Sequence, residues 1–348
     1  MMKKNLLGLT MDELKAFAVE LGEAPFRGRQ LFQWINRGEK DFSAMTDLST
    51  TLRDELKVRA CIRGVKIRDM QQDPGDGTRK FLYALEDGHA VEGVFMKYHY
   101  GNSLCVSSQV GCKMGCRFCA SALGGFVRNL TAAEMLDQVF TAEKNTAESI
   151  DHIVVMGMGE PFDNYENLKR FLRILHHPDG KNLSYRNITV STSGIIPVME
   201  QFAQEFPQVN LAVSLHRLED TARSELMPVN QVYPVDKLLE AAARCTEKNR
   251  RRITFEYILI EGENDRWQDV MLMKKKLRGM LCHVNLIPLN RVGETDLAAS
   301  SRKRAEEIAT ELSRSGIAAT VRRELGAGID GACGQLRLKM LDENEIGT

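Results

Sequence analysis

From residue 102 to about residue 325, short apolar segments alternate with longer amphipathic segments, and this alternation limits the possible folds more than any other feature. Strands that alternate with helices predict βα units and a parallel sheet. About six units are present, which predicts an α/β fold with a partial TIM-like (β/α)6 barrel instead of the full eight-stranded barrel. The predicted strands span residues 104–107, 152–156, 188–191, 209–214, 253–260 and 283–287, and the predicted helices span 131–143, 166–175, 198–206, 235–247, 267–281 and 302–315.

Polar motifs follow four of the predicted strands at the points where those strands end. In such folds the ligand site lies at the carboxyl ends of the strands. Gly159 lets the backbone approach a ligand, and Glu160 can pair with an ammonium group. Each motif could be an ordinary turn, and His216 alone could be a structural histidine, but four motifs on successive strands favour a binding site. The motifs contain Gly159, Glu160, Ser191, Ser214, Leu215, His216 and Asn290.

Three cysteines with CxxxCxxC spacing, Cys112, Cys116 and Cys119, lie on a glycine-containing segment. Thiolate sulfur suits iron–sulfur clusters or zinc, but a structural zinc site needs four protein ligands. No second CxxC pair is present in the chain. Three thiolates would fill three corners of a [4Fe-4S] cluster and leave one iron open for a small molecule. The alternatives are a loop of buried cysteines, an incomplete zinc site, or a non-catalytic iron–sulfur protein that senses a signal or binds RNA.

The chain has eight cysteines and no recognisable export signal, so metal or redox chemistry is expected before a disulfide framework. Cys333 lies between small residues in a glycine-rich tail, which favours a reactive thiol on a flexible arm over a buried, inert cysteine. Cys61, Cys245 and Cys282 are interpreted as packing residues. We expect a cytoplasmic protein without a membrane span, because the chain shows no signal peptide and no long apolar run.

The chain before residue 102 divides into two predicted parts. Residues 1–62 predict a small helical accessory domain, in which Thr10 and Glu13 form a capping box. Residues 63–101 predict a β-hairpin linker, and residues 102–348 form the barrel domain. The formal net charge is +0, but a local basic patch can still bind RNA. The end of the helical domain has a basic bias, which favours RNA contact slightly over a mere packing role. The basic residues there are Arg53, Lys57, Arg59, Arg63, Lys66 and Arg68.

Glu92 lies within an apolar strand of the predicted hairpin. From the residue pattern alone, Glu92 is interpreted as an edge-strand carboxylate that faces water. A general base is the less favoured interpretation. The alternative, catalytic interpretation depends on the resemblance described next.

These motifs together resemble the RlmN/Cfr family of radical S-adenosylmethionine (SAM) enzymes, which methylate adenine in RNA. The resemblance runs from residues 22–27, Gly-Glu-Ala-Pro-Phe-Arg, to residues 332–336, Ala-Cys-Gly-Gln-Leu. It implies that the three clustered cysteines bind a [4Fe-4S] cluster and that the strand-end motifs bind SAM. It further implies that Cys333 is methylated, that Cys105 is its resolving partner, and that Glu92 is the proton acceptor.

Two branches of this family methylate different carbons. Pro161 in Gly-Met-Gly-Glu-Pro and Ser193 in Ser-Thr-Ser-Gly resemble the branch that methylates C2, and the segment 120–125 does so too. Other segments, among them 96–98 and 233–236, are similar to the branch that methylates C8. C2 methylation is therefore favoured, and the alternative is a C8-methyltransferase of 23S rRNA that confers ribosomal antibiotic resistance. A radical SAM enzyme acting on protein or a small molecule is a further alternative, which Cys105 and Cys333 argue against.

The resemblance implies a defined reaction with two SAM molecules per turnover. One SAM methylates Cys333, and the second yields a 5′-deoxyadenosyl radical that takes a hydrogen from this methyl group. The resulting methylene radical adds to adenine, and Cys105 then attacks sulfur to release the product as a disulfide forms. The implied substrates are an adenosine in 23S rRNA and one in a tRNA anticodon loop. The implied electron donor is a flavodoxin or ferredoxin, and a monomer is expected.

Overall fold

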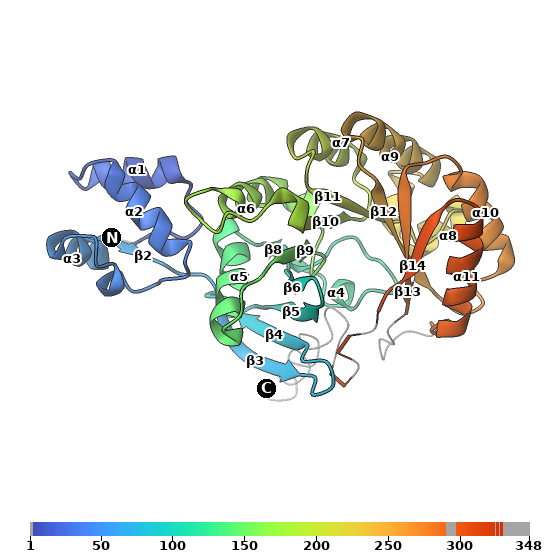
Figure 1. Cartoon of the computed structure of the whole chain (residues 1–348), viewed down its shortest axis with the longest axis horizontal. Coiled ribbons are helices and arrows are strands. Elements are labelled where there is room, and N and C mark those ends of the chain that lie inside the picture. The colour runs from blue at the N-terminus through green and yellow to red at the C-terminus, as the bar shows by residue number, and fades with distance from the viewer. Residues whose placement is uncertain (1–2, 290–296, 324, 327, 330–348) are drawn as a thin grey trace.

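A computed structural model describes residues 3–289, 297–323, 325–326 and 328–329 of the chain. Its N-terminal unit consists of β1 (Lys4–Asn5), α1 (Met11–Glu20), α2 (Phe26–Ile35), α3 (Thr50–Arg59) and β2 (Ala60–Cys61). Figure 1 shows these helices at one end of the molecule, beside the barrel. The predicted capping box is confirmed, because the Thr10 hydroxyl accepts the Glu13 N–H and the Glu13 carboxylate accepts the Thr10 N–H.

The segment predicted as a hairpin linker forms three antiparallel strands: β3 (Lys66–Gln72), β4 (Arg79–Ala84) and β5 (Ala90–Tyr98). Strand β5 also pairs with the first barrel strand, so this segment extends the barrel sheet at one side. Glu92 lies on β5 between two neighbouring strands and is 2% exposed. The interpretation of Glu92 as a water-facing edge residue is therefore wrong.

In the described part of the chain, ten strands from β3 to β14 form one sheet. The barrel part of this sheet is parallel, as predicted. The six predicted strands are β6 (Gly101–Cys105), β9 (His152–Val155), β10 (Ile188–Thr192), β11 (Asn210–Ser214), β12 (Ile253–Leu259) and β13 (Cys282–Pro288). A seventh parallel strand, β14 (Ala318–Val321), pairs with β13 and was not predicted. Among the described residues the sheet does not close, since β14 lies at one edge and β3 at the other. The barrel is therefore partial.

The predicted barrel helices are all present, and Figure 1 shows them along the outside of the sheet. They are α5 (Ala132–Thr146), α6 (Tyr165–His176), α7 (Ile196–Glu205), α9 (Val235–Asn249), α10 (Trp267–Leu277) and α11 (Arg302–Arg314). Helix α5 begins after Thr131, which forms a second capping box with Glu134. Between the sheet and these helices lies a continuous apolar core, which includes Phe171, Phe202 and Phe255.

Shorter elements complete the chain and carry parts of the site. They are β7 (Gln109–Gly111), α4 (Ala120–Leu123), β8 (Phe126–Asn129), α8 (Asp220–Leu226) and the 3-10 helices Phe42–Ala44, Pro161–Asn164, Tyr185–Asn187 and Pro228–Gln231. Within the described ranges, no helix combines the length and the apolar character that a membrane crossing requires.

Candidate active site

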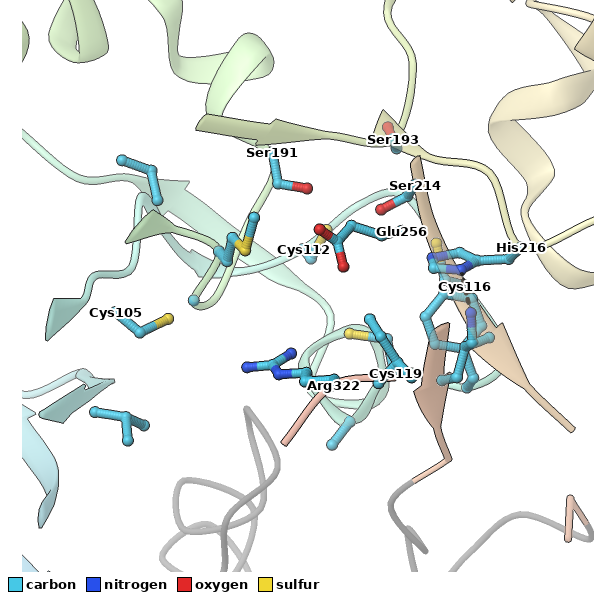
Figure 2. Close-up of a pocket in the computed structure, with 18 of the residues that line it drawn as sticks. Cys105, Cys112, Cys116, Cys119, Ser191, Ser193, Ser214, His216, Glu256 and Arg322 are labelled. Carbon is cyan, nitrogen blue, oxygen red and sulfur yellow. Dashed lines mark hydrogen bonds between the residues drawn. The ribbon is translucent and has the colours of Figure 1, made fainter. Parts of the chain in front are cut away.

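A cavity of about 710 Å³ lies at the carboxyl ends of the barrel strands. Its lining includes most of the residues that the sequence analysis selected, and Figure 2 shows several of them facing one another. The selected residues in the lining are Cys105, Cys112, Cys116, Cys119, Gly159, Glu160, Ser191, Ser214 and His216. Parallel strands deliver their carboxyl ends to the same edge of a sheet, which is why motifs far apart in the sequence meet here.

The loop that carries the three clustered cysteines is held by its own backbone. The Cys112 N–H donates to the Gly125 carbonyl (3.1 Å), and the Cys119 N–H donates to the Cys116 carbonyl (3.1 Å). Gly111 has a φ of 73°, and a Cβ at this position would lie 1.7 Å from the Gly125 oxygen. A side chain at Gly111 would therefore separate the two halves of the loop.

Cys112, Cys116 and Cys119 fit the requirements of a [4Fe-4S] cluster. All three line the cavity, and burial raises the pKa of Cys112 to about 12 and that of Cys116 further still. A bound metal favours the thiolate form that ligation requires. Among the described residues, no group of three or more His, Cys, Asp or Glu side chains is arranged to hold a single metal ion. A multi-iron cluster, in which each thiolate binds its own iron, does not require that arrangement.

Gly159 and Glu160 contact neighbouring parts of the protein at the cavity wall. Gly159 has a φ of 101°, and a Cβ there would lie 2.5 Å from the Cβ of Gln109. Glu160 is 3% exposed, and its two carboxylate oxygens accept the N–H groups of Phe162 (3.0 Å) and Ser193 (2.7 Å). Burial raises the pKa of this carboxyl group, although the hydrogen bonds oppose the rise. The first role of Glu160 is thus to connect two strand ends of the cavity wall.

His216 is a neutral histidine on the cavity wall. Its Nδ1 accepts the Ile258 N–H (3.0 Å), which leaves Nε2 as the N–H donor. Burial, together with the charge of Arg223, lowers the pKa of His216 to about 3. The ring packs edge-to-face on Phe118, with centroids 4.7 Å apart. The neighbouring Leu215 is fully buried and lies outside the cavity lining.

Arg223 on α8 is a fully buried residue behind the cavity that the sequence analysis missed. Its guanidinium group donates to the carbonyls of Leu215 (3.0 Å), Ser193 (3.1 Å) and Ser214 (2.9 Å), and to the amide oxygen of Asn230 (2.8 Å). These bonds connect the ends of β10 and β11, which carry cavity residues. Burial lowers the pKa of Arg223 to about 10.

We expect Arg223→Met to destabilise the protein by about 3 kcal/mol, because four acceptors lose a donor and three of these hydrogen bonds are buried. The measurement is urea unfolding, compared with Arg244→Met. Arg244 is 56% exposed in its side chain and pairs with Glu200, so its replacement should cost no more than about 0.5 kcal/mol. Equal losses for the two variants would contradict the structural role of Arg223.

Glu256 on β12 is a second cavity residue that the sequence analysis missed. It is 7% exposed and lines the cavity together with Arg322, and both are labelled in Figure 2. Burial raises its pKa, although the charge of Arg322 and a 2.8 Å hydrogen bond from Asn285 oppose the rise. The available signal was a single carboxylate within the apolar strand 253–260. This carboxyl group offers an acceptor to a ligand's ammonium or hydroxyl groups.

Cys105 and Glu92, the predicted site residues on β6 and β5, differ in their position relative to the cavity. Cys105, at the end of β6, is 6% exposed and lines the same cavity as the three clustered cysteines. Glu92 lies outside the cavity lining and forms a buried ion pair with Lys80 (3.0 Å). Two further predicted site residues, Asn290 and Cys333, lie outside the described residues.

Comparisons with known proteins agree with this architecture. Residues 4–62 match the family model "Ribosomal RNA large subunit methyltransferase N-terminal domain", and residues 106–273 match "Radical SAM superfamily". A protein of Alkaliphilus oremlandii named "Probable dual-specificity RNA methyltransferase RlmN" is 48% identical over 98% of this chain and 99% of its own length. The chain belongs to the RlmN family.

Two further similarities cover nearly the whole chain. A Geobacillus kaustophilus protein with the same name is 47% identical over 96% of this chain and 93% of its own length. The crystal structure of a radical SAM methyltransferase from Sphaerobacter thermophilus superposes with a TM-score of 0.91, at 43% identity, over 95% of this chain and 98% of that one. The predicted fold is confirmed, and the C8-methylating alternative is not favoured.

Membership of the RlmN family establishes the reaction class. RlmN proteins are radical SAM methyltransferases, and the radical SAM family uses a [4Fe-4S] cluster and SAM as its cofactors. The predicted enzyme class and cofactors are thus confirmed at the level of the family.

Proposed function

We propose that this chain methylates C2 of a specific adenosine in 23S rRNA and of an adenosine in the anticodon loop of tRNA. In this proposal Cys333 carries the methyl group, Cys105 releases the product, and Glu92 accepts the proton that the methylated carbon loses. The proposal includes a flavodoxin or ferredoxin as the electron donor and a monomeric, cytoplasmic enzyme.

The observation that carries the proposal is the position of Cys105. Its side chain lines the same cavity as Cys112, Cys116 and Cys119, although it lies on a different element. A disulfide requires two Cα atoms within about 7 Å, so a resolving cysteine must lie beside the reacting sulfur. The shared cavity supports a reaction in which cluster-dependent chemistry and thiol chemistry act on one substrate.

The cofactors and the chain have separate tasks in this proposal. When bound, the cluster supplies the electron that cleaves SAM, and SAM supplies both the methyl group and the hydrogen-abstracting radical. Cys112, Cys116 and Cys119 hold the cluster. SAM binding is assigned to Gly159, Glu160, Ser191, Ser214 and His216 of the cavity lining. The family resemblance adds Leu215, which lies outside this lining, and Asn290, which lies outside the described residues.

The assignment of Glu92 as proton acceptor rests on the family resemblance. In the structure, Glu92 lies outside the cavity lining and forms a 3.0 Å ion pair with Lys80. The backbone of Glu92 is also fixed in place, because its carbonyl accepts a hydrogen bond from the Ser107 hydroxyl (2.7 Å).

RNA contact at the end of the N-terminal unit and the start of β3 is part of the proposal, and the basic residues there fall into two groups. Lys57, Arg59 and Arg63 form ion pairs with nearby carboxylates. Lys66 and Arg68 lie exposed on β3, so these two residues are the better candidates for phosphate contact.

The test is mass spectrometry of RNA nucleosides from cells with and without this gene. We expect 2-methyladenosine to disappear from both 23S rRNA and tRNA when the gene is deleted. Loss of 8-methyladenosine, or no change in either nucleoside, would contradict the proposal.

We further expect RNA methylated with trideuteromethyl-labelled SAM to retain two deuterium atoms from the labelled methyl group. A methylene radical on Cys333 has lost one of the three, whereas direct methyl transfer would keep all three. High-resolution mass spectrometry of the isolated nucleoside distinguishes these results. Three retained deuterium atoms would exclude a methylene intermediate.

A further inference from the structure

The turn that joins β3 to β4 contacts the chain segment that follows β14. We call this segment the C-terminal arm, and its described residues are 322–323, 325–326 and 328–329. Asp73 in this turn is 6% exposed. Its Oδ1 accepts the Gly75 N–H (2.7 Å) within the turn, while its Oδ2 accepts the Gly328 N–H (2.7 Å) of the arm. One carboxylate therefore shapes the turn and holds the arm at the same time.

Asp76 repeats this arrangement three residues later. Its Oδ1 accepts the Thr78 N–H (2.8 Å), and its Oδ2 accepts the Gly326 N–H (2.9 Å) of the arm. Burial raises the pKa of Asp76, but these hydrogen bonds and the charge of Arg323 outweigh burial and leave the pKa below its ordinary value. The arm is thus held by two charge-assisted hydrogen bonds from one turn.

The two glycines of the arm permit this close approach. Gly326 has a φ of +68°, and a Cβ there would lie 3.2 Å from Cγ2 of Thr78. A Cβ at Gly328 would lie 3.1 Å from Oδ2 of Asp73, which is tighter than an ordinary van der Waals contact. An added methyl group at Gly328 would therefore press against the carboxylate that holds the arm.

The held part of the arm runs along the cavity. Leu325, Gly326 and Ile329 line the cavity, as does Thr78 from the turn. Cys333 follows Ile329 by four residues, and an extended chain spans at most about 3.6 Å per residue. Cys333 lies outside the described residues, and the four-residue connection from Ile329 can span at most about 14 Å.

We propose that Asp73 and Asp76 are positioning residues that tether the C-terminal arm to the cavity and thereby place Cys333 for reaction. The inference rests on the proposed role of Cys333 as the methylated residue. A tether lowers the range of positions that Cys333 samples, so it accelerates both methylation of Cys333 and attack on the adenine.

The test compares Asp73→Asn, Asp76→Asn and the double variant with wild type, all purified with their cluster. An amide supplies only one acceptor oxygen, so each variant must lose a bond either to the arm or within the turn. We expect kcat to fall about tenfold for each single variant and about 100-fold for the double variant. The KM for unmodified RNA should stay within about twofold, because the tether contacts the arm and not the substrate.

A second measurement distinguishes loss of the tether from a defect in RNA binding or in folding. Methylation of Cys333 by SAM in the absence of RNA, measured by mass spectrometry of its peptide, should slow in parallel with kcat. Asp69→Asn is the matched control, because the exposed Asp69 on β3 bonds to the neighbouring Met70 N–H and makes no hydrogen bond to the described part of the arm. Gly328→Ala should reproduce the loss while both carboxylates remain, even if the aspartate variants fold poorly.

The outcomes are distinguishable. A folded double variant with wild-type kcat, or a Gly328→Ala protein with wild-type Cys333 methylation, overturns the tether and leaves the proposed function intact. Equal losses in Asp69→Asn also overturn it. A wild-type protein that forms neither methylated Cys333 nor 2-methyladenosine overturns the proposed function and the tether together.

Discussion

Cys105→Ala should abolish turnover and accumulate a covalent complex of protein and RNA through Cys333. Cys105 lies at the end of β6 in the wall of the shared cavity. In the proposed mechanism its sulfur attacks the sulfur of Cys333. Without this attack the bond between Cys333 and the methylated base persists, while cluster assembly, methylation of Cys333 and addition to adenine still proceed. Denaturing electrophoresis with radiolabelled RNA measures the complex.

The control for this experiment is the double variant Cys105→Ala with Cys333→Ala, which should form no complex. Normal turnover by Cys105→Ala would remove Cys105 from the proposed mechanism. Loss of turnover without a covalent complex would instead place Cys105 at an earlier step.

Cys112→Ala, Cys116→Ala and Cys119→Ala should each reduce methylation to background, because each removes one of the three proposed cluster ligands. We expect anaerobically purified wild type to hold about four irons per chain in an oxygen-sensitive cluster. Each variant should lose most of its iron and sulfide, measured by colorimetric assays and by electron paramagnetic resonance after reduction.

Cys61→Ala is the matched control for cluster loss. Cys61 lies on β2 in the N-terminal unit, outside the cavity lining, so its replacement should leave iron and sulfide content unchanged. If any one of the three cavity variants retains full iron content, the ligand assignment for that cysteine is incorrect.

Much of the fold could be predicted because its signals are local in the sequence. The start of α1 depends on Thr10 and Glu13, which are three residues apart. The six predicted strands are short apolar runs between amphipathic helices. Strand β14 was missed because its burial alternates between exposed and half-buried positions at the edge of the sheet. An edge strand needs few apolar residues and therefore has a weak sequence signal.

The sequence by itself determined the parallel barrel, the spacing of Cys112, Cys116 and Cys119, and the strand-end motifs, because each depends on residues close together in the chain. Only the tertiary structure decided the surroundings of Glu92, Glu160 and Glu256. Their partners come from other strands and loops, and sequence spacing does not show which polar groups a fold brings together. Each of these carboxyl groups depends on partners that the fold supplies, since a buried polar group must find its hydrogen bonds within the protein.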